Sequence, residues 1–319
     1  MKTIGVLTSG GDAPGMNAAI RAVVRYGIYN DINVLGINKG YRGLIENDIE
    51  KMDLSSVADI IHRGGTALGT ARCKKFMTEE GFQEALDTIK YRDIDGIVVI
   101  GGDGSFKGAK ELSEAGVKTV GIPGTIDNDL AYTDYTIGFS TALETILDAI
   151  SKIRDTSSSH ERTIIMEVMG RNCGDLALYS GLAGGAEMVL IPEIQISIEK
   201  VADKINQGMA RGKKHSIIML AEGAGDAYSI RDQINKHIDV PIRCTVLGYI
   251  QRGGTPVSFD RLLGSRMGAN AVKCLIEGRN NVVLGTKDGK IFDIEIEKAL
   301  NMEKNFDNEA FELTKILSI

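Results

Sequence analysis

Glycine and aspartate residues that suit phosphate chemistry follow directly after short apolar runs in this sequence. The segment Gly101–Ser105 reads Gly-Gly-Asp-Gly-Ser and follows the apolar run Gly96–Ile100. Glycines let backbone N–H groups approach a nucleotide phosphate, and magnesium prefers one or two carboxylates together with phosphate oxygens and water. An aspartate that only capped the next helix would need no flanking glycines. The segment therefore predicts a nucleotide site with a metal ligand at Asp103.

A second glycine-rich segment, Gly10–Asn17, joins the apolar run Thr3–Thr8 to a helical pattern. It lacks the G-K-[ST] ending of a P-loop and the G-x-G-x-x-G fingerprint of dinucleotide-binding proteins. Its glycines suit a phosphate at a helix N-terminus, but a plain tight turn explains them equally well. Both interpretations stay open for this segment by itself.

A third segment, Pro123–Asp129, places the carboxylates of Asp127 and Asp129 two residues apart. In an extended loop, such side chains point to the same side. One can accept a proton from an attacking hydroxyl while the other organises a metal or the base. In isolation, a surface loop with an Asx turn is the better explanation of this segment.

Five arginines lie beside glycines or at the ends of predicted strands. Guanidinium groups bind phosphate through two parallel hydrogen bonds and offset the charge that develops in phosphoryl transfer. Most arginines in any protein are solvated or in surface ion pairs, so no single one is informative. Together they predict phosphate clamps at Arg72, Arg162, Arg171, Arg243 and Arg252.

The elements that must position these residues alternate between short apolar runs and helical stretches. Met16, Ala19, Ile20, Val23 and Val24 recur at three- and four-residue spacings, which predicts a helix with one buried face. Continuous apolar runs alternating with helices indicate parallel strands buried on both faces. Ligands of such α/β sheets bind beyond the carboxyl ends of the strands. The predicted strands are Thr3–Thr8, Gly96–Ile100, Thr119–Pro123, Arg162–Val168 and His215–Ala221.

A chain of 319 residues exceeds the usual size of one core, so two lobes are expected. The helical stretch Ser140–Arg154 is the predicted connection between them. Net charge of −6 argues against a general nucleic-acid binder. The apolar runs are too short to cross a bilayer, and the start of the chain has no signal-peptide pattern. Four separated cysteines without a C-x-x-C pair predict reduced thiols in a cytoplasmic protein.

Over essentially its whole length the chain resembles the bacterial ATP-dependent 6-phosphofructokinases of the type A family. The resemblance rests on the segments already quoted and on three shorter motifs. These are Met169-Gly170-Arg171, Ala221-Glu222-Gly223 and Gln251-Arg252-Gly253-Gly254. Together the motifs are highly specific, whereas a single glycine turn is not.

The resemblance implies two Rossmann-like lobes with mainly parallel sheets between helices, and an active site in the cleft between the lobes. The larger, ATP-binding lobe would comprise residues 1–138 and about 251–301. The smaller lobe, which binds the sugar phosphate, would comprise residues 139–250 and about 302–319.

The implied reaction belongs to glycolysis: phosphorylation of fructose 6-phosphate at C1, giving fructose 1,6-bisphosphate and ADP, with Mg²⁺ bound at Asp103. Asp127 would be the general base, with Thr125, Asp129, Arg72 and Arg171 completing the catalytic set. The implied ATP contacts are Gly11, Tyr41, Arg72, Cys73, Gly102, Asp103, Gly104 and Ser105. The implied sugar-phosphate contacts are Thr125, Ile126, Asp127, Arg162, Met169, Gly170, Arg171, Glu222, Arg243, Tyr249 and Arg252.

The resemblance also implies a homotetramer with active and effector sites at subunit interfaces. Arg162 and Arg243 would reach into a neighbouring subunit's active site. ADP or phosphoenolpyruvate would bind an effector site lined by Arg21, Arg25, Asp59, Arg154, Gly185, Glu187, Arg211, Lys213, Lys214 and His215. From the residues alone, the run Arg211–His215 is better explained as a solvated loop.

Several positions bear on the choice of phosphoryl donor and on effector and substrate binding. Pyrophosphate-dependent relatives tend to carry Asp and Lys where this chain has Gly104 and Gly124, so ATP is the expected donor. Leu54 stands where some relatives have an effector-binding arginine. Tyr249 replaces the usual histidine beside the sugar phosphate and cannot carry positive charge. Ser140 replaces a common aspartate, with no evident physical consequence.

Three alternatives compete with the resemblance. Another kinase with a Gly-Gly-Asp-Gly turn, such as an NAD or lipid kinase, would lack the Thr125–Asp129 loop and the Met169-Gly170-Arg171 clamp. A catalytically silent nucleotide sensor would have lost a base or metal carboxylate, yet Asp103 and Asp127 are present. A dinucleotide dehydrogenase would carry the missing G-x-G-x-x-G fingerprint.

Overall fold

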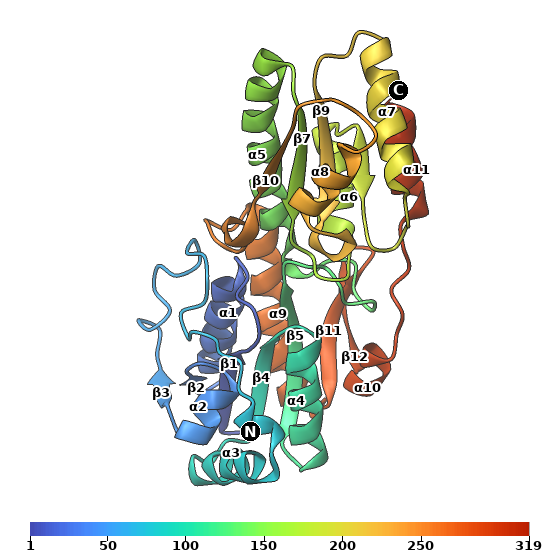
Figure 1. Ribbon diagram of the computed structural model, residues 1–319. Helices are drawn as coiled ribbons and strands as arrows, with labels where there is room; N and C mark the ends of the chain where they lie inside the picture. The colour runs from blue at the N-terminus through green and yellow to red at the C-terminus, as the bar shows by residue number, and fades with distance from the viewer. Residues whose placement is uncertain (319) are drawn as a thin grey trace. The chain divides into compact units, whose positions relative to one another are not determined.

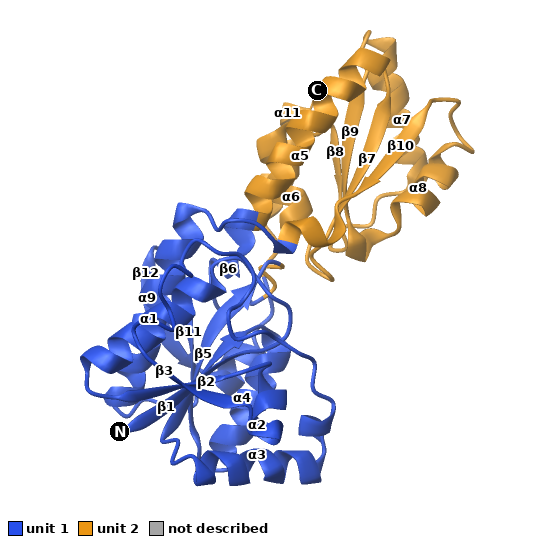
Figure 2. Ribbon diagram, turned by 90° about the vertical axis from the view of Figure 1, so that its left-hand side faces the viewer, with its two compact units in different colours: residues 1–126, 130–141, 252–304 blue, residues 127–129, 142–251, 305–319 orange. Residues whose placement is uncertain are grey.

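The computed structural model describes residues 1–318 as two compact units, coloured separately in Figure 2. Unit 1 comprises Met1–Ile126, Leu130–Thr141 and Arg252–Lys304. Unit 2 comprises Asp127–Asp129, Ala142–Gln251 and the C-terminal segment from Asn305. Residue 319, the last of the predicted smaller lobe, lies outside the described residues.

Unit 1 is built on a mostly parallel sheet (Figure 1). Within the described residues its eight strands run in the order β12-β11-β5-β4-β1-β2-β3, with β6 paired to β5. The antiparallel pairs are β2–β3 and β11–β12, at the two edges. The strands are β1 (Thr3–Thr8), β2 (Asn33–Ile37), β3 (Ile49–Met52), β4 (Gly96–Gly101), β5 (Lys118–Thr125), β6 (Ile137–Gly138), β11 (Val282–Lys287) and β12 (Lys290–Glu295).

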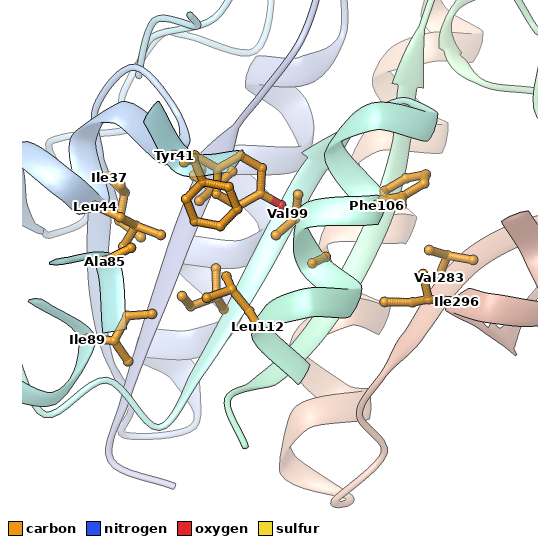
Figure 3. Close-up of a cluster of buried hydrophobic side chains, with 14 of the residues drawn as sticks. Ile37, Tyr41, Leu44, Ala85, Ile89, Val99, Phe106, Leu112, Val283 and Ile296 are labelled. Atoms are coloured by element: carbon orange, nitrogen blue, oxygen red, sulfur yellow. The ribbon is translucent and has the colours of Figure 1, made fainter. Parts of the chain in front are cut away.

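Helices cover the sheet of unit 1, and their apolar faces bury the central strands. Figure 3 shows one resulting cluster, in which Tyr41 lies near Val99 and Phe106 lies near Val283. Strands β1 and β4 are buried along almost their whole length, as expected for strands covered on both faces. The helices are α1 (Met16–Tyr29), α2 (Tyr41–Glu46), η1 (Lys75–Met77), α3 (Glu79–Tyr91), α4 (Asp103–Glu114), α9 (Ser258–Ile276) and α10 (Ile296–Leu300).

Unit 2 repeats the design on a smaller scale, with a parallel sheet in the order β10-β7-β9-β8. Its strands are β7 (Thr163–Val168), β8 (Met188–Leu190), β9 (Ser216–Ala221) and β10 (Ile242–Val246). Its helices are α5 (Phe139–His160, beginning in unit 1), α6 (Asp175–Gly184), α7 (Ile198–Ala210), η2 (Glu222–Ala224), α8 (Ala227–Ile234), η3 (Gly248–Arg252, ending in unit 1) and α11 (Asn308–Leu317). Ile165, Val201, Ile218 and Ile230 lie in its core.

The predicted α/β fold with mainly parallel strands is confirmed. Each strand predicted from an apolar run is present within one or two residues of its expected bounds. The helix expected at Ser140–Arg154 is longer and extends to His160. Among residues 1–318, no helix is both long and apolar enough to span a membrane.

Candidate active site

In unit 1, the two glycine-rich turns lie side by side because β1 and β4 are adjacent and parallel. Thr8 pairs with Ile100 in their register, so the carboxyl ends of both strands lie side by side. The amide of Ser9 donates to the carbonyl of Ile100 (2.9 Å), and the Ser105 hydroxyl donates to the carbonyl of Ser9 (3.0 Å). This contact joins the Gly10–Gly11 turn to the first turn of α4. The two glycine-rich segments thus lie against each other at the carboxyl ends of β1 and β4.

Only glycine fits at position 101, because an added Cβ would lie 2.5 Å from the carbonyl oxygen of Ser9. At Gly104 the opposite holds: a Cβ there would meet no described atom within 4 Å. No described side chain caps α4 at Gly102. Helix N-terminal amides of this kind, with the positive end of the helix dipole, suit a phosphate group.

Tyr41 contacts the Gly101–Ser105 turn through its hydroxyl. Its ring is buried, stacks on Phe76 with centroids 4.2 Å apart, and lies close to Gly108. Its hydroxyl donates to the carbonyl of Ser105 (2.5 Å), and burial raises its pKa. Tyr41 therefore shapes the turn through Ser105, with its ring directed into the core.

Asp103 is the first residue of α4, and its side chain is 43% exposed. Its carboxylate pairs with Lys107 one turn later (2.7 Å). No group of three or more His, Cys, Asp or Glu residues suited to a metal occurs among residues 1–318. An accessible carboxylate beside the open space at Gly104 fits a magnesium ion that takes its other ligands from phosphate and water.

A loop between β3 and η1 brings Arg72 and Cys73 towards the same turns. Asn17 is buried and anchors the loop, donating to the carbonyl of Arg63 (3.0 Å) and accepting from the amide of Ala67 (2.7 Å). Thr70 donates to the carbonyl of Gly10 (2.8 Å). Arg72 is exposed and Cys73 half-buried.

Arg252 lies against the other side of the glycine turn. A Cβ at Gly11 would lie 3.0 Å from its guanidinium nitrogen Nη1, so a larger residue at position 11 would require the Arg252 side chain to shift. Arg252 belongs to unit 1, where its guanidinium lies beside Gly11 of the Gly10–Gly11 turn. The sequence predicts neither this contact nor the anchoring role of Asn17.

In unit 2, the motif Met169-Gly170-Arg171, which is expected to contact the sugar phosphate, follows the carboxyl end of β7. Arg171 has a left-handed backbone (φ 51°), and its amide donates to Oε1 of Glu222 (2.8 Å), which follows the carboxyl end of β9. Nε of Arg171 lies 3.3 Å from Oδ2 of Asp127. The Asp127 side chain is 4% exposed and that of Arg171 53%. Three residues predicted from separate motifs, Asp127, Arg171 and Glu222, are thus joined.

The loop that carries Asp127 is fixed to unit 2 by residues that sequence reasoning missed. Nδ2 of Asn128 donates to Oδ2 of Asp175 (2.9 Å), and both side chains are buried. The amide of Met169 donates to Oε1 of the buried Gln251 (3.1 Å). Gln251 stands in the motif that carried the resemblance, whereas Asp175 carries no signal beyond its place at the start of a helix.

Arg162 and Arg243 lie at the other end of the same sheet. Arg162 directly precedes β7, and Arg243 is the second residue of β10, paired with Ile164. Arg171 follows the opposite end of β7, a six-residue strand about 20 Å long. Arg162 and Arg243 therefore lie far from the Arg171–Asp127 pair of the same chain.

The expected effector residues fall into two groups. Arg21 and Arg25 on α1 and the exposed Asp59 belong to unit 1.

The second group lies in unit 2. Arg154 donates to the carbonyls of Gly184 and Gly185. Glu187 pairs with Lys213 (2.8 Å) and accepts from the amide of Ile217. Lys204, Arg211 and Lys213 line a small cavity with Glu187. Lys214 pairs with Glu161 (2.7 Å), and His215 is half-buried.

Unit 1 carries glycine-rich turns of the kind that suits phosphates, and unit 2 carries a carboxylate–arginine pair; phosphoryl transfer uses both kinds of group, as expected of a phosphotransferase. The sequence pattern described as Phosphofructokinase matches residues 3–275. The chain belongs to the phosphofructokinase family.

Relatives agree with this assignment. Proteins named ATP-dependent 6-phosphofructokinase from Alkaliphilus metalliredigens and Clostridioides difficile are 63% and 60% identical over 319 residues, covering 100% of each chain. The solved phosphofructokinase of Saccharomyces cerevisiae is 35% identical with a TM-score of 0.88, covering 94% of this chain and 45% of the yeast chain. A pyrophosphate-dependent phosphofructokinase from Marinobacter aquaeolei shares the fold, with a TM-score of 0.88 at 21% identity, covering 99% of this chain and 91% of that one.

Proposed function

We propose that the chain transfers the γ-phosphoryl group of ATP to the C1 hydroxyl of fructose 6-phosphate, with Asp127 as the general base. The ATP-dependent 6-phosphofructokinase activity follows from the family and from full-length relatives of that name at 56–63% identity. The observation that carries the residue assignment is the Asp127–Arg171 pair beside Glu222. A nearly buried carboxylate can accept the proton of the sugar hydroxyl, and the arginine beside it can bind a phosphate group.

ATP is assigned to unit 1, where the Gly10–Gly11 and Gly101–Ser105 turns meet. The start of α4, which no described side chain caps, supports binding of its phosphates, with Arg72 as a further cation. Asp103 would hold Mg²⁺, which supplies charge neutralisation to the phosphates when bound. The open space at Gly104 supports ATP as the donor, since a side chain there would occupy it.

The sugar phosphate is assigned to unit 2, with Glu222, Arg171 and the backbone of Met169 and Gly170 as contacts. Asp127 takes the proton of the C1 hydroxyl as the C1 oxygen bonds to the γ-phosphorus. The bond from that phosphorus to the β–γ bridging oxygen breaks, and ADP leaves. Arg72 and Arg171 offset the charge on the transferring group.

Oligomerisation and regulation are part of the proposal. Arg162 and Arg243 lie at the amino ends of β7 and β10, away from Arg171. This position supports the proposal that they bind substrate in a neighbouring subunit's active site. The Glu187–Lys213 pair near Arg211 supports an anionic effector such as ADP or phosphoenolpyruvate. Sedimentation of the purified protein tests the homotetramer, and activity titrations with each effector test the regulation.

The first experiment is a coupled assay with fructose 6-phosphate and Mg²⁺ that compares ATP with pyrophosphate. Formation of fructose 1,6-bisphosphate with ATP is the expected result. Activity with pyrophosphate alone would keep the reaction and overturn the donor assignment. Absence of activity with both would favour a nucleotide sensor, which ATP-binding calorimetry would then identify.

A further inference from the structure

The loop that carries Asp127 is held to unit 2 by a buried polar pair. Asn128 follows Asp127 directly and has a left-handed backbone conformation (φ 51°), which few residues other than glycine adopt and asparagine tolerates. Its Nδ2 donates to Oδ2 of Asp175 at 2.9 Å. Asn128 is 5% exposed and Asp175 is 6% exposed, so water competes little for this bond.

Asp175 lies in a segment that already contacts the catalytic loop. It is the first residue of α6, where the positive end of the helix dipole favours a carboxylate. Arg171, four residues earlier, pairs with Asp127 and is itself fixed by Glu222 through its amide. Segment 171–175 therefore makes two separate links to consecutive residues of the loop, one to Asp127 and one to Asn128.

The two links differ in chemistry. The Arg171 side chain is half-exposed, so the sugar phosphate proposed to bind there would compete with Asp127 for it. The Asn128–Asp175 bond is buried and involves no substrate-binding group. Oδ2 of Asp175 accepts this hydrogen bond, so the amide nitrogen of Asn128 faces α6.

We propose that Asp175 is a positioning residue for phosphoryl transfer: through Asn128 it fixes the orientation of the Asp127–Asp129 loop, so that the Asp127 carboxylate stays aimed at the acceptor hydroxyl. The proposal rests on the proposed role of Asp127 as the base. Asn128, with its left-handed backbone, lies between Asp127 and Asp129. A change in its backbone angles would therefore alter the orientation of both carboxylates. Misplacement of a reacting group by about 1 Å lowers rates by about 100-fold.

The first test compares Asp175→Ala with Asp175→Asn in the full-length enzyme. The alanine variant removes the acceptor, so we expect kcat to fall by about 10- to 100-fold with KM for ATP and fructose 6-phosphate changed little. The asparagine variant keeps a carbonyl acceptor for Asn128, so its kcat should recover by at least about tenfold over the alanine variant. Equal kcat values in the two variants, or a loss in KM alone, would overturn the proposal.

The second test exchanges the two side chains and does not depend on the alanine variant folding. Asn128→Asp places two carboxylates together and should lower kcat strongly. Adding Asp175→Asn restores an amide–carboxylate bond in the reverse direction, and we expect kcat to rise again by about tenfold or more. A double variant no more active than Asn128→Asp would overturn the positioning role. Thermal unfolding of each variant separates loss of fold from loss of turnover.

A third measurement separates this proposal from the assignment of the base. In an Asp127→Ser background, Asp175→Ala should lower kcat no further, since the group being positioned is gone. Full additivity of the two losses would show that Asp175 acts independently of Asp127, against the proposal. If Asp127→Ser alone left turnover unchanged, the base assignment would fail, whatever Asp175 does.

Discussion

Nε of Arg171 lies 3.3 Å from Oδ2 of Asp127, and the same arginine donates its backbone amide to Glu222. Asp127 follows β5, Arg171 follows β7, and Glu222 follows β9. The left-handed backbone of Arg171 lets its amide and its side chain serve two partners at once. One residue thereby joins the proposed base to the proposed sugar-binding carboxylate.

Replacing Asp127 by serine removes the group proposed to accept the C1 proton. General-base catalysis contributes about 10²- to 10⁴-fold, so kcat should fall by that order with little change in KM for fructose 6-phosphate. Steady-state kinetics measure both constants. The matched control is Asp148→Asn on the exposed surface of α5, whose ion pair with Lys152 contributes little. Unchanged kcat in Asp127→Ser would remove Asp127 from the base role.

Gly104→Asp should discriminate against ATP without harming the fold. A Cβ at this position meets no described atom within 4 Å, so the side chain enters open space, and its charge repels phosphate. We expect KM for ATP to rise by about tenfold or more, since one like-charge contact changes binding by about 1–2 kcal/mol. Gly104→Ala is the control for bulk without charge. Wild-type ATP kinetics in the aspartate variant would contradict the donor assignment.

Tyr41→Phe removes the buried hydroxyl that donates to the carbonyl of Ser105. An unpaired buried acceptor costs about 1–3 kcal/mol, so the free energy of unfolding should fall by about that amount. Because Ser105 belongs to the Gly101–Ser105 turn, which is proposed to bind the phosphates of ATP, KM for ATP should rise as well. Urea unfolding and ATP kinetics measure the two effects. Tyr29→Phe, at an exposed position on α1, should change neither.

Asp260 predicts a particular pH dependence of stability. This fully buried carboxylate accepts from the amides of Gly138 (2.9 Å) and Thr141 (2.8 Å) and from the Thr141 hydroxyl (2.6 Å). Burial raises its pKa above the ordinary value of 3.8, against the effect of these hydrogen bonds. Between those two pKa values the folded state binds more protons than the unfolded state, so stability from Asp260 falls as pH rises.

Asp260→Asn lacks this titration. The stability advantage of the wild type over the variant should therefore be largest below pH 3.8 and shrink as pH rises through the folded-state pKa. Urea unfolding at several pH values between about 3.5 and 7 measures it. An advantage that grew with pH would mean that the hydrogen bonds outweigh burial and hold the folded-state pKa below its ordinary value.

Much of the fold follows from local patterns. Buried parallel strands such as β1 and β4 are recognisable because strands covered on both faces need continuous apolar runs. The Gly101–Ser105 turn is recognisable because only glycine allows the backbone to approach Ser9 so closely. The family motifs then identify the reaction, since their residues occur in a fixed order along the chain. The glycine at position 104 is likewise visible in the sequence.

Other features depend on which distant segments pack together. Asp175 has no sequence signal as a partner of Asn128, because hydrogen-bond partners are set by the packing of α6 and not by spacing. The pattern that predicts phosphate clamps at Arg162 and Arg171 does not show that the two arginines lie at opposite ends of β7, which depends on the direction of that strand. The sequence likewise does not show that the ring of Tyr41 is buried against Gly108, because that contact depends on how α2 packs against α4. Sequence determined the residue types, and tertiary packing decided their partners, because contacts between remote segments exist only once the sheets have formed.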